Sequence, residues 1–105
     1  MRALEALADP TRREIVDLLA EGELDAGTIA SRFPVSRPAV SRHLRVLREA
    51  GLVNVRPDAQ RRLYALDPAP LAELDAWLAR YRVFWANRLD ALDVHLRRER
   101  RRKER

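Results

Sequence analysis

Two short helices are expected at the start of the chain, over residues 1–8 and 10–20. Apolar residues recur there at three- and four-residue steps, which is the spacing of an amphipathic helix. The first segment has Leu4 and Leu7 on one side. The second begins at Asp9-Pro10, an N-cap residue followed by a proline that suits the first helical position.

The next two helices are expected over residues 25–33 and 36–50, with a tight connection between them. Asp25 and Ser36 are N-cap residue types at the start of each segment. Gly51 follows the second segment and is a typical helix terminator.

After these helices the pattern changes to alternation of apolar and polar residues, which is typical of strands. Residues 52–56 and 61–66 alternate in this way and are joined by the turn residues 57–60, so a β-hairpin is expected. Helical spacing returns over residues 70–96, where it predicts one long last helix.

This order of elements predicts a mostly α-helical winged helix-turn-helix with a small β-hairpin, in a single domain over residues 1–96. The apolar stripe of the last helix is wider than so small a domain can cover. We therefore expect a homodimer formed by residues 1–8 and 70–96. Aromatic residues of the last helix could alternatively line a ligand pocket. The expected interface residues are Leu4, Leu7, Leu74, Leu78, Tyr81, Trp85 and Leu92.

The positive charge of the chain is concentrated in two places. The net charge is +5, and residues 97–105 alone carry seven basic and two acidic groups. This segment is expected to be a basic, disordered tail. The other 96 residues sum to zero, but within them residues 32–62 hold eight arginines against two acids. Such a local excess favours a polyanion-binding face in the middle of the chain.

The segment over residues 36–50 has the character of a DNA recognition helix. Val40, Leu44 and Leu47 lie on one face and should pack inward. The other face carries serines and arginines, which suit close approach to DNA and hydrogen bonds to guanine or phosphate. With the hairpin tip, the expected DNA-binding residues are Ser36, Arg37, Ser41, Arg42, Arg45, Gln60, Arg61 and Arg62.

Within this set, Ser41 and Arg42 are the candidates for base contacts because they lie in the middle of the helix on its outer face. A contact to phosphate alone is the alternative, since most protein–DNA hydrogen bonds go to the backbone. Arg37 and Arg45 are expected on phosphates.

Four positions with basic or titratable side chains have less uniform roles in this interpretation. Arg61 and Arg62 alternate along a strand, so only one of them is expected to reach DNA, and the sequence does not say which. Arg48 lies near the helix C-terminus, where it complements the helix dipole. His43 is expected to be a packed structural residue.

Four motifs occur in order along the chain: Leu7-Ala8-Asp9-Pro10-Thr11-Arg12, Ser36-Arg37-Pro38-Ala39-Val40-Ser41-Arg42-His43-Leu44, Gly51-Leu52-Val53, and Arg61-Arg62-x-Tyr64-x-Leu66. Together they resemble the ArsR/SmtB family of bacterial repressors. The resemblance covers residues 3–66. It implies a homodimeric winged helix that binds a near-palindromic operator and represses transcription.

Many members of that family sense metals, but the metal-binding positions are not matched in this chain. The family's Cys-x-Cys pair would fall at about Asp25 and Gly27, and the sequence contains no cysteine. Asp93-Val94-His95 matches the first half of the family's second site, whose other half would begin near residue 106. No metal and no cofactor are therefore expected, and the resemblance is to the branch without sensing cysteines.

The sequence is compatible with two other functions. One is a sensor that a metal or a small hydrophobic effector releases from DNA, and the other is an architectural winged helix that does not read sequence. An enzyme is not expected, because no set of catalytic residues occurs in a believable context. The chain has neither an apolar run of about 18 residues nor an apolar leader, so a cytoplasmic protein is expected.

Overall fold

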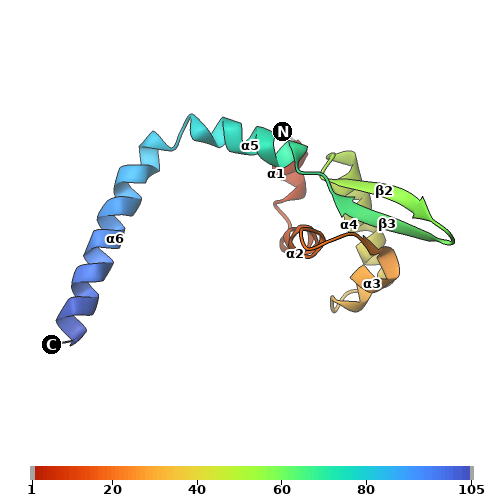
Figure 1. Cartoon of the computed structure of the whole chain (residues 1–105), viewed down its shortest axis with the longest axis horizontal. Helices are drawn as coiled ribbons and strands as arrows, with labels where there is room; N and C mark the ends of the chain where they lie inside the picture. Colours follow the sequence, from red (N-terminus) through yellow and green to blue (C-terminus); the bar gives the residue numbers. More distant parts are fainter. Residues whose placement is uncertain (1, 105) are drawn as a thin grey trace. The chain divides into compact units, whose positions relative to one another are not determined.

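A computed structural model describes residues 2–104, and its residues fall into two compact units, Met1–Leu74 and Asp75–Arg105 (Figure 1). The single domain expected over residues 1–96 stays a prediction. In chain order the elements are α1 (Arg2–Ala6), α2 (Pro10–Leu19), β1 (Leu24–Asp25), α3 (Ala26–Ser31), α4 (Arg37–Glu49), β2 (Val53–Asp58), β3 (Arg61–Leu66), α5 (Ala69–Ala79) and α6 (Val83–Glu104).

α2 and α4 begin at the predicted N-caps. The Asp9 carboxylate accepts a hydrogen bond from the backbone N–H of Arg12 at 3.1 Å. The Ser36 hydroxyl accepts one from the backbone N–H of Ala39 at 3.3 Å. Each bond satisfies a donor that the first helical turn leaves without a partner. Asp25 precedes α3, as predicted, but its side chain makes no capping bond to that helix's backbone.

α4 ends at Gly51, which has φ +76°. Its N–H bonds to the carbonyl of Arg48, and the N–H of Leu52 bonds to that of Leu47, each at 2.9 Å. This pair of bonds is a Schellman motif, in which glycine takes the left-handed position at least cost. Leu52 is fully buried directly after it, so the turn fixes where the chain enters the wing.

The core of the first unit lies between the helices and one face of the sheet. It is built from residues of α1, α2, α3, α4 and the start of the wing: Ala3, Ala6, Ile15, Val16, Leu19, Ile29, Val40, Leu44, Leu47, Leu52 and Val53. Close packing of these side chains holds α4 against α2 and α3.

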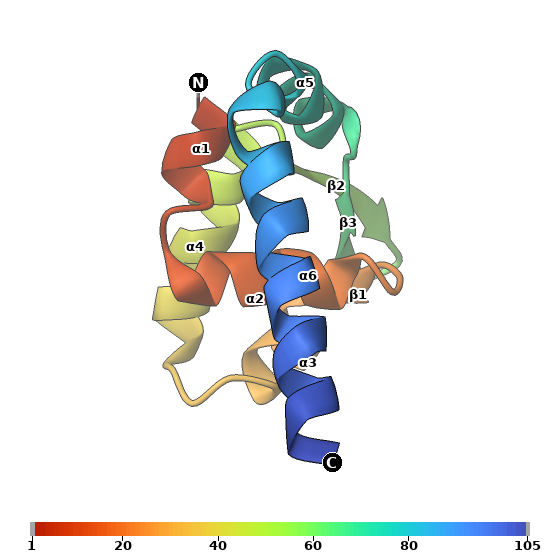
Figure 2. The same ribbon diagram turned by 90° about the vertical axis from the view of Figure 1, so that its left-hand side faces the viewer.

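Backbone carbonyls anchor α1, which lies beside α4 (Figure 2). Arg12 of α2 donates through Nε to the carbonyl of Ala6 at 2.6 Å. Arg2 donates through Nη1 to the carbonyl of Glu49 at 3.3 Å. The carbonyls of Ala6 and Glu49 lie at the C-terminal ends of α1 and α4, where helical hydrogen bonds are lacking. These charge-assisted bonds therefore hold α1 on the first unit.

The sheet has three antiparallel strands in the order β1-β3-β2. The hairpin of β2 and β3 was predicted, and its register pairs Val53 with Leu66 and Asp58 with Arg61. β1 was not predicted: its two residues pair with the other edge of β3, Leu24 opposite Tyr64. In Figure 1 the hairpin extends past the helices of the first unit, as a wing does.

The predicted single helix over residues 70–96 is wrong. α5 ends at Ala79 and α6 begins at Val83, with i→i−3 backbone bonds between them, such as Tyr81 N–H to the Leu78 carbonyl at 2.9 Å. No glycine or proline breaks this stretch, so the pattern contained no signal of a turn. The residues from Tyr81 to Trp85 are mostly aromatic or β-branched, which weakens the helix there.

Other contacts stabilise this turn between α5 and α6. Arg82 forms an ion pair with Asp75. The rings of Trp77 and Tyr81 have centroids 5.2 Å apart, and those of Tyr81 and Phe84 are 6.2 Å apart. These separations are in the range of favourable aromatic pairs. Ring packing on the turn therefore offsets the helical hydrogen bonds that are missing there.

The disordered tail expected over residues 97–105 is also wrong for its described part, because α6 continues to Glu104. Arginine and glutamate are good helix formers, and no glycine or proline follows Leu96. Arg97 pairs with Asp93 at 3.1 Å, one turn back along the helix. Met1 and Arg105, which belong to the predicted first helix and tail, lie outside the described residues. No described helix is long and apolar enough to cross a membrane.

Candidate nucleic-acid interface

α4 has one buried and one exposed face, as the sequence predicts. Val40, Leu44 and Leu47 are no more than 1% exposed and hold the helix on the core. The predicted outer residues are all exposed: Ser36, Arg37, Ser41, Arg42 and Arg45, together with Arg48. Because the inner face is fixed by packing, the outer face is presented in one orientation.

Arg42 and Arg45 lie on this outer face without a carboxylate partner among the described residues. The same is true of Arg37 at the first turn and of Arg62 on β3. Unpaired guanidinium groups keep all of their hydrogen-bond donors available for an anionic ligand. The arrangement can therefore bind the phosphates or base edges of a nucleic acid.

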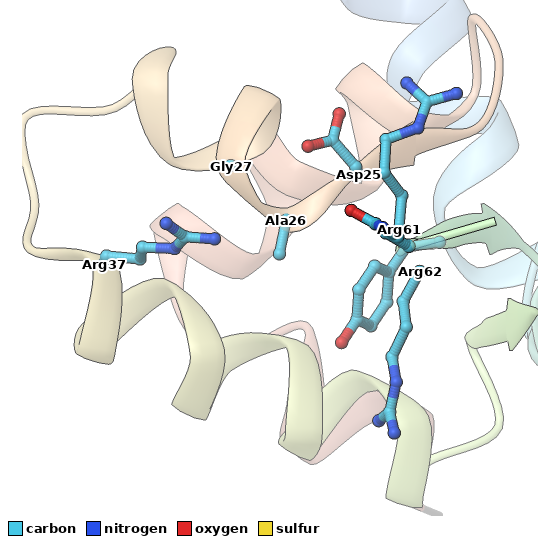
Figure 3. A pocket seen from close by; sticks show the side chains of 8 residues that line it. Asp25, Ala26, Gly27, Arg37, Arg61 and Arg62 are labelled. Atoms are coloured by element: carbon cyan, nitrogen blue, oxygen red, sulfur yellow. The ribbon is translucent and has the colours of Figure 1, made fainter. Parts of the chain in front are cut away.

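The register of the wing separates the two arginines that the sequence could not distinguish. Arg62 is two residues from Tyr64, which packs against the core, so both lie on the face of the sheet turned toward the helices. Arg61 lies on the other face. Figure 3 shows the two guanidinium groups pointing in opposite directions.

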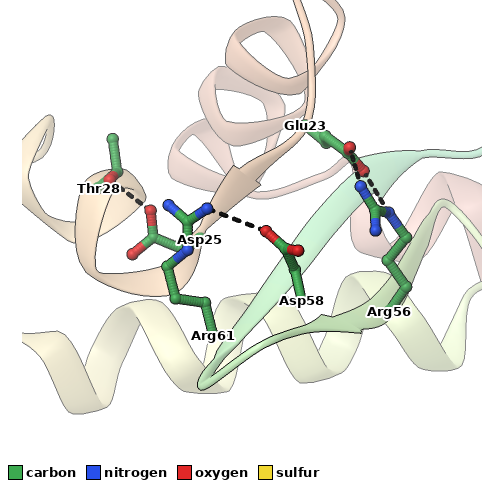
Figure 4. A network of polar contacts seen from close by, with 6 residues as sticks. All are labelled: Glu23, Asp25, Thr28, Arg56, Asp58 and Arg61. Carbon is green, nitrogen blue, oxygen red and sulfur yellow. Dashed lines mark hydrogen bonds and ion pairs between the residues drawn. The ribbon is translucent and has the colours of Figure 1, made fainter.

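The face that carries Arg61 holds a network of ion pairs (Figure 4). Arg61 bonds to Asp58 at 2.9 Å across the hairpin turn. Arg56 binds both carboxylate oxygens of Glu23, at 2.5 and 3.0 Å, and so joins β2 to the segment before β1. The guanidinium of Arg56 holds the pKa of Glu23 below its usual value. Two of the eight arginines in residues 32–62, Arg56 and Arg61, are therefore already paired with carboxylates of the protein.

Asp25 lies next to this network at the start of α3. Its carboxylate accepts a hydrogen bond from the Thr28 hydroxyl at 2.5 Å. This bond, with a smaller contribution from the positive charge of Arg61, lowers the pKa of Asp25. The charged carboxylate therefore lies beside Arg61 and reduces the positive potential on that face.

A depression of about 340 Å³ lies between α3, the first turn of α4 and the wing (Figure 3). Both wing arginines border it with Arg37, and its full lining is Asp25, Ala26, Gly27, Arg37, Gln60, Arg61, Arg62 and Tyr64. Gly27 leaves little room above it, because a Cβ atom there would lie 3.3 Å from Oδ2 of Asp25, while Nη2 of Arg37 would be at an ordinary contact distance of 3.7 Å. Sequence reasoning missed Gly27 and Tyr64 here, although alternation does place Tyr64 on the Arg62 face.

His43 is half-buried on α4, next to the exposed face. Its Nδ1 atom is 3.5 Å from Nη1 of Arg12, the residue that also ties α1 to α2. This contact agrees with the predicted structural role of His43.

The positions considered for metal binding are scattered. Asp25 bonds to Thr28, and Asp93 pairs with Arg97 on α6. Among the side chains of residues 2–103, no three His, Asp or Glu groups are gathered in a way that would hold a metal ion.

The residues expected at a dimer interface differ in exposure. In the first unit Leu7 packs against the core, whereas Leu4 is 42% exposed. In the second unit Tyr81, Trp85 and Leu92 are exposed. Leu74 and Leu78 are half-buried.

Comparison with known proteins gives a consistent result. The model of the family described as bacterial regulatory protein, arsR family, matches residues 9–55. The HTH-type transcriptional regulator Rv2034 of Mycobacterium tuberculosis is 54% identical over 88 residues, which are 84% of this chain and 79% of that protein. The transcriptional repressor SdpR of Bacillus subtilis is 36% identical over 77 residues, covering 73% of this chain and 86% of that protein.

Among solved structures, the crystal structure of a possible transcriptional regulator for arsenical resistance is similar, with a TM-score of 0.72 and 47% identity. The similarity covers 90% of this chain and 96% of that one. The fold is thus the predicted winged helix-turn-helix, and the relatives are transcriptional regulators rather than enzymes. The chain belongs to the ArsR family of bacterial DNA-binding transcriptional regulators.

Proposed function

We propose that the chain is a homodimeric transcriptional repressor that binds a near-palindromic operator through α4 and the wing, without sensing a metal. The observation that carries this proposal is the outer face of α4. Arg42 and Arg45 are exposed there without a carboxylate partner among the described residues, while Val40 and Leu44 fix the opposite face in the core. A helix of this length fits the major groove of duplex DNA.

In this proposal different residues of α4 contact the bases and the phosphates of the DNA. Ser41 and Arg42 meet base edges, since they lie in the N-terminal half of the helix on its exposed face. Arg37 and Arg45 bind phosphates and set the position of the helix on the duplex. Ser36 lies at the helix start, where backbone N–H groups and the helix dipole also favour phosphate.

The wing supplies a second contact through Arg62. It is exposed, has no ion pair among the described side chains and lies on the face of the sheet turned toward the helices. Arg61 is held by Asp58 and contributes less. Gln60 at the hairpin tip completes the proposed contact.

The homodimer is proposed from the apolar surface of the second unit. Trp85, Leu89, Leu92 and Leu96 follow helical steps on α6 and are 37%, 57%, 51% and 51% exposed. A contiguous apolar stripe of this kind usually marks an association surface. The proposed interface also includes Leu4 of α1. Two-fold symmetry of the dimer would set the two copies of α4 about 34 Å apart, which is one turn of DNA.

Repression follows from an operator occupied by such a dimer, which would exclude RNA polymerase in the cytoplasm. The relative SdpR is named a repressor. The experiment that tests the proposal is selection of duplexes from a pool of random sequence by the purified chain. A two-fold symmetric consensus is expected. A pool that stays random after repeated rounds would contradict the proposal and would favour a winged helix that does not read sequence.

A further inference from the structure

The C-terminal part of α6 is a strongly basic helix. Its residues 97–103, called here the basic end, carry six positive side chains and one carboxylate, and all six basic side chains are exposed. Because the helix continues to Glu104, these charges are held on a fixed scaffold with 1.5 Å of rise per residue. They project all around the helix axis rather than from one face.

Carboxylates within α6 neutralise only part of this charge. Arg97 pairs with Asp93 at 3.1 Å, and Arg102 lies 3.7 Å from Glu99. The other basic side chains, Arg98, Arg100, Arg101 and Lys103, have no ion pair with a side chain of residues 2–103. Like charges three and four residues apart repel each other along a helix, and an anionic ligand would remove this repulsion.

We propose that the basic end of α6 is a second DNA-binding surface, which binds the phosphate backbone of duplex DNA without reading sequence. Arginine suits this role, because its planar guanidinium makes paired hydrogen bonds to phosphate oxygens. Binding would release counterions condensed on the DNA, so its strength falls as salt is raised.

The order of residues along α6 argues against a membrane surface as the partner. Helices that lie on membranes carry basic residues on the face opposite their apolar face. In α6 the apolar and basic parts follow one another instead. Between Val83 and Leu96 the charged residues are Arg88, Asp90 and Asp93, a net charge of −1, and the basic end begins only after the apolar stripe stops.

The family membership of the chain argues for DNA over other polyanions. Once the first unit has bound a duplex, DNA is present at high local concentration for every other part of the same chain. A weak, sequence-independent contact from α6 then becomes effective without strong affinity of its own. The inference therefore depends on DNA binding by the family, but not on a particular operator or on repression.

The test compares two full-length variants with equal reduction of positive charge. R100Q/R101Q removes two charges from the basic end, and R80Q/R88Q removes two elsewhere in the second unit. All four arginines are exposed and lack ion pairs with the side chains of residues 2–103, and glutamine has a similar helix propensity. Affinity for a duplex of random sequence is measured over a series of salt concentrations, and circular dichroism checks that both variants keep their helices.

The proposal predicts a shallower slope of log affinity against log salt for R100Q/R101Q, by about 0.9 for each DNA phosphate that the variant no longer neutralises. R80Q/R88Q should keep the slope of the wild-type chain. Equal slopes for the two variants would overturn the proposal. So would an effect confined to binding of an RNA hairpin or of vesicles containing phosphatidylserine, because the partner would then not be duplex DNA. Failure to select an operator would refute the proposed repressor but leave this comparison unchanged.

Discussion

Arg61 and Arg62 are neighbours on β3, yet Arg61 is bound to Asp58 at 2.9 Å on one face of the sheet and Arg62 lies on the other. This difference predicts unequal effects on DNA binding. Arg62→Ala should weaken binding to all sequences and reduce the salt slope by about 0.9, as expected when one phosphate is no longer neutralised. Arg61→Ala should have a smaller effect. Titration of labelled duplex at several salt concentrations measures both, and a larger effect of Arg61→Ala would refute the assignment.

Arg42 is predicted to read a base. Arg42→Ala should cost about 1–3 kcal/mol on the preferred duplex and relax the preference at one base position of each half-site. Its matched control is Arg45→Ala, which should weaken binding to all duplexes to a similar extent. The measurement is competition between the consensus duplex and single-base variants. A uniform weakening by Arg42→Ala would assign Arg42 to the phosphate backbone.

Ala59 is strained at the tip of the wing. Its φ of +56° lies in the left-handed region, where a side chain costs about 1–2 kcal/mol and glycine has no such penalty. Ala59→Gly should therefore raise the free energy of unfolding, by about 1 kcal/mol at most because glycine also gains entropy in the unfolded chain. Ala65→Gly, within β3, should lower it. Urea unfolding measures both, and destabilisation by Ala59→Gly would contradict the turn geometry.

α4 was the most predictable part of the chain, because local chemistry defines it. Ser36 caps it, Gly51 ends it, and Val40, Leu44 and Leu47 repeat at helical steps. Each signal acts within a few residues, so the sequence contains it directly.

Features that depend on distant contacts could not be predicted. β1 has only two residues, and it is a strand because it pairs with the distant β3, with Leu24 opposite Tyr64. The packing of the sheet on the helices decides which of Arg61 and Arg62 lies on the helix-facing side, and alternation along the strand does not indicate that side. The turn around Tyr81 lacks the glycine or proline that would have indicated it.

The stability of the folded chain should decrease in acid, because three carboxylates have lowered pKa values. The pKa values of Asp9, Glu23 and Asp25 are lowered in the folded chain by hydrogen bonds from Arg12 N–H, Arg56 and Thr28. Their contribution is complete above the ordinary pKa values of 3.8 and 4.5 and is lost as pH falls through the lower folded values.

Urea unfolding between neutral pH and pH 3 measures this dependence. Glu23→Gln should show a smaller decrease in acid, because the variant cannot take up a proton at that position. Glu14→Gln is the control, since Glu14 is exposed on α2 and has no ion pair among the described residues. An unchanged acid dependence in Glu23→Gln would mean that its pair with Arg56 does not contribute to stability.

The apolar stripe of α6 predicts the oligomeric state. The wild-type chain should sediment as a dimer of the 12.2 kDa chain. Leu89→Ser with Leu92→Ser should weaken association at least about a hundredfold, because burying each leucine contributes about 1.5–3 kcal/mol. Asn87→Ser, on the opposite side of α6, should have no effect. Sedimentation equilibrium distinguishes these outcomes, and a wild-type monomer at micromolar concentration would contradict the proposed interface.

The central claim is that the exposed face of α4 reads DNA sequence. The most direct measurement is the ratio of affinities for the selected duplex and for a scrambled duplex of the same length, at one physiological salt concentration. The wild-type chain should show a ratio of about 10³ or more, and Arg42→Ala a lower ratio. Equal affinities for the two duplexes would contradict the claim.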